Sequence, residues 1–183
     1  MIRKFIALVA LVAAPTLSVA QTAAAPPASA SPVSDAIRAI LGRRMKAVSA
    51  AADAMPADKF SFKPTADQIT FAHLTLHIAE SNTLFCSKIS GAEPPADPKL
   101  TDTDSKDKLV ANLKASFEYC TTVLAKVDDS HLGDSVTLGN GPAVTRAAVN
   151  FFLASSLADH YAAQAFYLRM NGILPPSAQP PKP

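Results

Sequence analysis

Four stretches of this chain repeat apolar residues at steps of three and four. This spacing places apolar side chains on one face of an α-helix. The stretches are 34–55, 65–90, 105–127 and 142–170. The period-two alternation of a β-strand is confined to residues 135–138. The sequence therefore predicts an all-α domain, with a four-helix bundle as its leading architecture.

Capping residues set the predicted ends of these helices. Ser34 can cap the first helix, and Thr65 with Gln68 has the spacing of a capping box at the start of the second. Gly91 can end the second helix, and Pro142 suits the first turn of the fourth.

Each predicted helix carries a stripe of candidate core residues. In the second helix the stripe comprises Ile69, Ala72, Leu76, Ala79, Thr83 and Cys86. In the third it comprises Leu109, Leu113, Phe117, Cys120, Leu124 and Val127. In the fourth it comprises Val149, Phe152, Ser156, His160, Ala163, Tyr167 and Met170.

Residues 1–20 have the three parts of a cleavable signal peptide. Arg3 and Lys4 precede the apolar stretch 5–14, and small residues then predict cleavage before Gln21. A membrane anchor is the alternative, but the apolar run is shorter than the roughly 20 residues that cross a bilayer, and Pro15 interrupts it. We expect a periplasmic or secreted protein with no stable membrane anchor after cleavage.

The composition of the remaining chain marks one folded unit. Residues 21–33 are Ala/Pro-rich and read as a linker, and 177–183 form a Pro-rich tail. Residues 34–176 are then left for a single bundle domain. The formal net charge is +2 with no basic stripe, which argues against a nucleic-acid partner.

Short motifs recur along the predicted helices, at 71–74 with 77–79, 85–87, 119–120, 159–161 and 167–176. These segments resemble the DinB-like superfamily and, more closely, its small exported members. The order and spacing of the segments are more specific than any one of them. The resemblance spans most of the chain from Ser34 to Pro176.

The resemblance implies an up-down-down-up bundle whose second and third helices run parallel, joined by a long crossover. The Pro-rich stretch 93–102 fits that crossover. Family members commonly hold a divalent metal with one histidine from the second helix and two from the fourth, spaced four apart. His77 and His160 match two of these positions, while Ser156 stands where the pattern has a histidine. Some members are thiol-dependent transferases, and many have no assigned activity.

The residues themselves offer a second way to complete a metal site. His73 and His77 are one helical turn apart and share a face. With His160 they would form a three-histidine site for a divalent zinc, nickel or manganese ion. Glu80 could add an oxygen ligand or accept a hydrogen bond from a ligand. The alternative is that these histidines are polar groups hydrogen-bonded to their neighbours at helix interfaces.

The two cysteines, Cys86 and Cys120, can be read in two ways, as buried free thiols or as a disulfide. If their helices were antiparallel, the cysteines would lie about 17 Å apart along the axis, whereas in parallel helices they would be nearly level. A disulfide needs Cα atoms within about 7 Å. The family's parallel arrangement and an oxidising compartment favour the bond.

Two functional hypotheses remain from the sequence. In the first, a histidine-lined metal site acts on a small molecule by activating a thiol or water. In the second, a bundle that has lost the family's metal site is a non-catalytic binding or dimerisation module. A bundle of this kind can form a homodimer, although the sequence identifies no surface for one.

Overall fold

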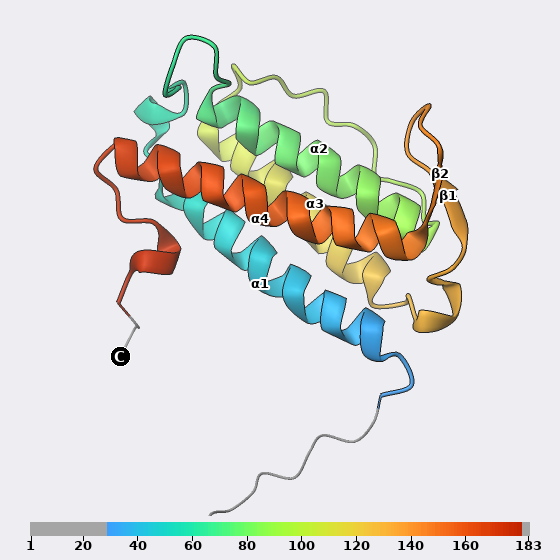
Figure 1. The fold of residues 1–183 in the computed structure, drawn as a ribbon. Helices are drawn as coiled ribbons and strands as arrows, with labels where there is room; N and C mark the ends of the chain where they lie inside the picture. Colours follow the sequence, from blue (N-terminus) through green and yellow to red (C-terminus); the bar gives the residue numbers. More distant parts are fainter. Residues whose placement is uncertain (1–28, 181–183) are drawn as a thin grey trace, which may run out of the picture.

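The computed structural model describes residues 29–180, and four α-helices make up most of this part (Figure 1). The predicted signal peptide 1–20 lies outside the described residues, as does most of the linker. No helix within residues 29–180 is long and apolar enough to cross a membrane. The helices are α1 (Pro32–Ala54), α2 (Phe71–Ser90), α3 (Lys106–Leu124) and α4 (Arg146–Met170).

Shorter elements occupy the connections between and after the helices. The 3-10 helices are η1 (Ala57–Lys59), η2 (Asp129–His131) and η3 (Pro176–Ala178). The strands β1 (Ser135–Thr137) and β2 (Ala143–Thr145) pair antiparallel and form a small hairpin before α4.

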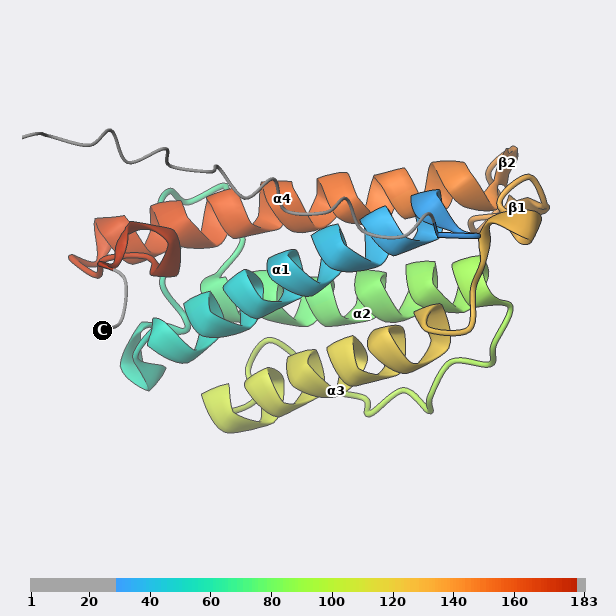
Figure 2. The same cartoon turned by 90° about the horizontal axis from the view of Figure 1, so that it is seen from below.

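The helices form the up-down-down-up bundle that the family resemblance implies. Helices α2 and α3 run in the same direction, and α1 and α4 run opposite to them (Figures 1 and 2). A parallel pair requires a connection that returns along its full length, and residues 91–105 make this crossover. Helix α2 packs on α3 on one side and on α4 on the other, so it is shared by both halves of the bundle.

Cys86 and Cys120 join α2 to α3 in a disulfide, with their Cα atoms 5.3 Å apart. Both residues are fully buried in the core. Beside them Asn82 donates a hydrogen bond to the Ser116 carbonyl at 2.9 Å. The parallel arrangement therefore brings the cysteines level, as the family resemblance predicted.

The apolar stripe of α3 is buried as predicted, except that Val127 lies beyond the helix and is partly exposed. The predicted stripes of α2 and α4 are less accurate. Leu76 and Thr83 of α2 are only half-buried, and Phe152 of α4 is 49% exposed.

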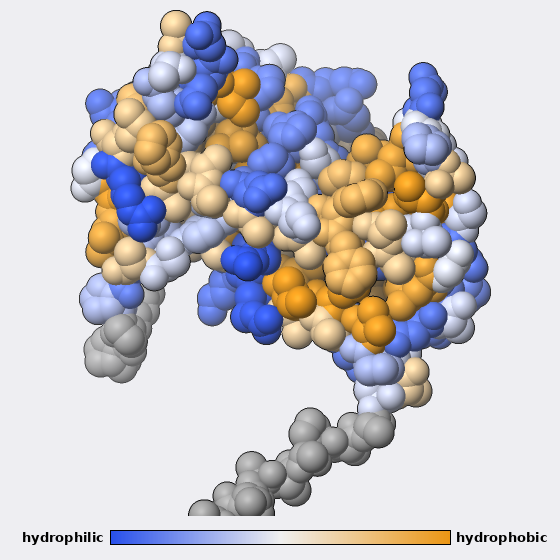
Figure 3. Space-filling model, viewed as in Figure 1, coloured by the Kyte–Doolittle hydropathy of each residue, from blue (hydrophilic) through white to orange (hydrophobic). Residues whose placement is uncertain are grey.

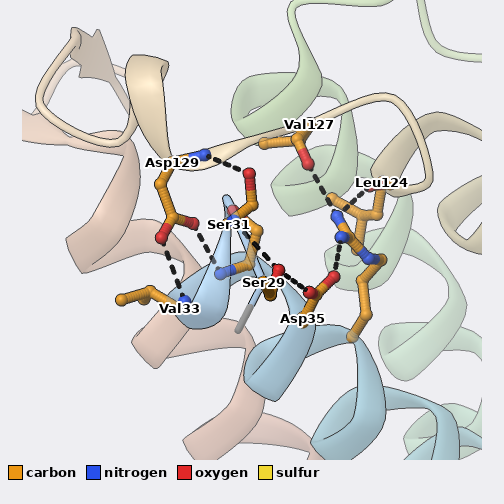
Figure 4. Close-up of polar contacts among 9 residues, drawn as sticks. Ser29, Ser31, Val33, Asp35, Leu124, Val127 and Asp129 are labelled. Atoms are coloured by element: carbon orange, nitrogen blue, oxygen red, sulfur yellow. Dashed lines mark hydrogen bonds and ion pairs between the residues drawn. The ribbon is translucent and has the colours of Figure 1, made fainter. Parts of the chain in front are cut away.

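Helix α1 begins at Pro32, two residues before the predicted cap Ser34, because a distant carboxylate serves its first turn. Asp129 accepts hydrogen bonds from the amides of Val33 at 3.0 Å and Ser34 at 2.8 Å (Figure 4). Hydrogen bonding by Ser34, and then by Val33, holds the pKa of Asp129 below its usual value. The helix is therefore capped from η2, 95 residues away in the sequence.

Arg38 makes the reciprocal contact at the far end of α3. Its guanidinium donates to the carbonyls of Leu124 at 3.1 Å and Val127 at 2.6 Å, and it also pairs with Asp35 (Figure 4). A cation is favourable at the C-terminal end of a helix, where carbonyl groups lack partners. Together, Asp129 and Arg38 lock the start of α1 to the end of α3.

Helix α2 begins at Phe71, and the capping box predicted at Thr65 and Gln68 is wrong. Residues before Phe71 fold back in an irregular hook, in which the Phe71 amide donates to Phe62 and the Ala72 amide to Phe60. Thr70 is the actual cap and accepts a hydrogen bond from the His73 amide. The aromatic rings of this hook pack edge-on, with Phe60 and Phe71 centred 5.2 Å apart. Tertiary packing thus overrides the local capping signal.

Helix α4 begins at Arg146, four residues after the predicted start at Pro142. The intervening residues pair with β1, and Val136 lies opposite Val144 in the hairpin. Thr145 then caps the helix by accepting from the Ala148 amide at 3.2 Å. The alternation at 135–138 corresponds to β1, whereas β2 lies within the stretch predicted as helix.

Large apolar side chains are exposed on the face shown in Figure 3, and they gather where α1 and α4 begin. Phe151 and Phe152, in the first two turns of α4, are 60% and 49% exposed. Phe166 and Met170, near the other end of α4, are also exposed. The outer face of α4 is therefore more apolar than a fully solvated helix requires.

Removal of the disulfide should lower the free energy of unfolding by a measurable amount. Closing a 34-residue separation should stabilise the fold by about 3–4 kcal/mol in the chain-entropy model. We expect the Cys86→Ala/Cys120→Ala double variant to lose roughly that much in urea unfolding relative to the wild type. Thiol titration of the wild type in denaturant without reductant should find no free thiol. Two titrating thiols would contradict the bond.

Candidate functional site

His77 of α2 and His160 of α4 face one another across the interface between these helices. Their ring centroids are 5.2 Å apart and the ring planes meet at 89°. Each residue sits near the middle of its helix, so both backbones are held by regular hydrogen bonding. The two histidines that the family resemblance singled out are thus brought together from residues 83 positions apart.

The site is open on the α2 side and more enclosed on the α4 side. His77 is exposed, and its Nε2 lies 3.4 Å from the Ser81 hydroxyl one turn further along. His160 is half-buried. Burial lowers the pKa of His160, and the neighbouring His77 lowers it further, while Asp159 acts in the opposite sense. The lowered pKa favours the neutral form of His160 at neutral pH, which is the form that can bind a metal or accept a proton.

His73, the third predicted ligand, makes a different contact. Its Nδ1 lies 3.3 Å from Asp102 Oδ2 in the crossover. Both side chains are about half exposed, so the pair is a surface contact between α2 and the crossover. The structure thus engages His73 with an acidic partner that sequence spacing could not reveal. Glu80 is exposed one turn beyond His77.

His77 and His160 could supply two ligands to the divalent metal that the family resemblance implies. Nitrogen–metal bonds of about 2.0–2.1 Å at a tetrahedral angle place two imidazole centres roughly 5 Å apart, close to the observed 5.2 Å. Ser156, one turn before His160, occupies the position of the family's remaining histidine. Within residues 29–180 no three His, Cys, Asp or Glu side chains are grouped closely enough to share an ion. His77 and His160 are therefore the two predicted ligands that the described structure brings together.

A hydrogen bond and aromatic packing fix the register of α2 against α4. The Tyr167 hydroxyl donates to the Ile69 carbonyl at 2.8 Å, just before α2 begins. The Tyr167 ring also packs on Phe62 and Phe71. These contacts lie about two turns from His160 on α4, so they hold the histidine pair in place without touching it.

Gln164, one turn beyond His160, is a feature that the sequence analysis missed. It is fully buried, yet neither its amide nitrogen nor its carbonyl oxygen has a partner among the described residues. Its sequence signal is a single polar residue between the apolar positions of α4. Burying an unpaired amide costs about 1–3 kcal/mol, so this position opposes folding.

Comparison with known proteins identifies the family. The sequence profile of the DinB superfamily matches residues 40–163, more than half of the chain. The chain belongs to the DinB superfamily. No curated protein sequence matches it.

Solved structures of DinB-superfamily and related proteins share the fold. A DinB-like protein of Bacillus subtilis superposes with a TM-score of 0.65 at 22% identity, over 79% of this chain and 99% of that one. YfiT of Bacillus subtilis, described as a probable metal-dependent hydrolase with an unusual four-helix bundle topology, gives 0.60 at 16% identity, over 81% and 93%. The mycothiol-dependent maleylpyruvate isomerase gives 0.60 at 14% identity, over 70% of this chain and 59% of that one. At these identities the likeness establishes the fold alone.

The environment of His160 predicts a depressed pKa in the metal-free protein. NMR titration should place the pKa of His160 below its ordinary value of 6.5. Since burial and the His77 charge both lower it, His77→Ala should raise the value toward 6.5. Because the folded pKa is lowered, the stability that this group contributes is present above pH 6.5 and is lost as the pH falls below it. An His160 pKa at or above 6.5 would contradict the observed burial.

Because the side-chain amide of Gln164 is buried without a hydrogen-bond partner, Gln164→Met should stabilise the protein. Methionine keeps the length of the side chain and removes both unpaired polar groups, so the free energy of unfolding should rise by about 1–3 kcal/mol. Gln68→Met, at an exposed position, is the matched control and should change stability little. A clear loss of stability in Gln164→Met would show that the amide is hydrogen-bonded in solution.

Proposed function

We propose that this DinB-superfamily protein is exported and binds a divalent metal ion between α2 and α4 through His77 and His160. The observation that carries the proposal is the facing pair of imidazoles, centred 5.2 Å apart. The neutral form of His160, favoured by its lowered pKa, supports it because a protonated imidazole cannot bind a metal.

Export is supported by the leader pattern of residues 1–20 and by the Cys86–Cys120 disulfide. Disulfides persist in oxidising compartments and are rare in the cytosol of mesophiles. The mature chain would then be periplasmic or secreted and begin at Gln21. Intact mass of the protein purified after expression with its own leader checks this, and a retained leader would contradict it.

The chain's own residues define what such a site can do. His77 and His160 would hold the ion, and Ser81 contacts the His77 ring at 3.4 Å and helps to orient it. A bound divalent metal would supply a Lewis acid able to activate a thiol or water on a small molecule. With two protein ligands, more coordination positions stay open to exogenous ligands than at a three-histidine site.

The type of ligand predicts which metals bind, and the missing third histidine predicts which variant binds metal more tightly. We expect zinc and nickel to raise the melting temperature of the chelator-treated protein more than manganese does, since imidazole prefers the former. His77→Ala and His160→Ala should abolish the shift. Ser156→His restores the family's spacing of two histidines four residues apart. Loss of a residue that only supports a metal ligand typically costs roughly 10- to 100-fold in metal affinity, so adding a direct ligand should tighten binding by at least about tenfold. Calorimetric titration measures the affinities.

The control in this series is His73→Ala. Because His73 contacts Asp102, its removal should leave metal affinity unchanged, whereas a three-histidine site made of His73, His77 and His160 would lose affinity. If Ser156→His also fails to bind metal, the two histidines do not face each other in solution and the proposal is wrong.

The second candidate is a non-catalytic binding or dimerisation module, and Ser156 favours it. A serine hydroxyl is a poor replacement for an imidazole in a zinc or nickel site. Under this hypothesis the wild type shows no stabilisation by any of the metals, while Ser156→His does. The same titration therefore separates the two functions.

A further inference from the structure

A pocket of about 520 Å³ lies on the outer side of the α2–α3 pair, beneath the crossover. One wall comes from α2, with Glu80, Thr83 and Leu84, and another from α3, with Asn112 and Ala115. Crossover residues 94–98 form the roof. Figures 1 and 2 show the crossover running back along these helices. The histidine pair, in contrast, lies on the α4 side of α2.

The roof is stiff and is held at both ends. Pro94, Pro95 and Pro98 fix its backbone torsions. At one end the Tyr119 hydroxyl donates to the Ala92 carbonyl at 3.2 Å. At the other end His73 contacts Asp102. A proline-rich segment anchored in this way cannot readily collapse onto the helices, so the pocket is formed in advance of any ligand.

The floor of the pocket is equally fixed. Ser116 lies in it, and its carbonyl accepts the hydrogen bond from buried Asn82. The Cys86–Cys120 disulfide sets the spacing of α2 and α3 at this level. Neither helix can therefore shift to fill the space without disturbing the covalent link.

The chemistry of the lining selects a class of ligand. Apolar walls come from alanine, leucine and proline side chains, and no Lys, Arg or His lines the pocket. Its acidic side chains are Glu80 and Asp97. Asp97 already pairs with exposed Lys99 at 3.0 Å, whereas Glu80 has no ion-pair partner among the described residues. Thr83 and Asn112 add neutral polar groups. The pocket thus combines an apolar body with an unpaired negative charge.

We propose that this pocket binds a small, mainly apolar organic cation, with its ammonium group at Glu80 and its hydrocarbon body between the proline roof and α3. An organic anion of the same shape would be repelled by the unpaired Glu80, with no lysine, arginine or histidine in the lining to compensate. The lining includes neither His77 nor His160, so the proposal does not depend on a metal bound by this pair.

The test compares three probes of one shape on the purified full chain: 4-phenylbutylamine, 4-phenylbutanol and 4-phenylbutyrate. Calorimetric titration should give the tightest binding for the amine and binding at least about tenfold weaker for the carboxylate, the size expected for one charge-assisted hydrogen bond. Glu80→Gln should weaken amine binding by about tenfold and leave the alcohol unchanged. Equal binding of amine and carboxylate would overturn the proposal.

Two further variants separate this pocket from other sites. Ala115→Trp, at an exposed α3 position, should fill the pocket and abolish binding of all three probes. Glu118→Gln, an exposed acid on the α1-facing groove of the same helix, should have no effect. His160→Ala should remove metal binding and leave amine binding intact. If Ala115→Trp folds and still binds the amine with wild-type affinity, the site is elsewhere and the proposal fails.

Discussion

The parallel pairing of α2 with α3 is the constraint on which the rest of this molecule depends. Parallel neighbours cannot be joined by a tight turn, so the chain needs the crossover of residues 91–105. That crossover roofs the outer pocket and carries Asp102 to His73. The disulfide then makes the pairing covalent, at a depth where both cysteines are fully buried. With one side of α2 committed to α3, its other side is left to pack on α4, and this is where His77 meets His160.

The sequence was sufficient for the helix periodicity but not for the places where distant segments intervene. Helix α3 matched closely because its cap, Ser105, and its apolar seam are both local features. The start of α2 was missed because Phe60 and Phe62 supply carbonyls to the amides of Phe71 and Ala72, and no spacing rule contains that contact. The same reason applies to α1, whose first amides are bonded by Asp129 from beyond α3.

The expected meeting of His77 and His160 across the helices is found in the structure, whereas their role as metal ligands together with His73 stays a prediction. The meeting of His77 and His160 followed from the family resemblance, since it depends on how α2 and α4 pack. The pairing of His73 with His77 rested on helical spacing alone, which places both on one face but does not say what else reaches that face. Asp102 does reach it, from a crossover whose path is irregular. Gln164 shows in the sequence only as a polar residue among apolar positions, because the lack of a partner for its buried amide is visible only in the structure.

The two sides of α2 are held with different strength, and this difference bears on function. On the α3 side there is a covalent bond and a buried hydrogen bond from Asn82. On the α4 side the described contacts are apolar packing, the Tyr167–Ile69 hydrogen bond and two histidines in edge contact. An ion held by His77 and His160 would therefore act as a second cross-link, on the side of α2 that lacks one. Binding there would be coupled to the stability of the α2–α4 interface, because any opening of the interface separates the ligands.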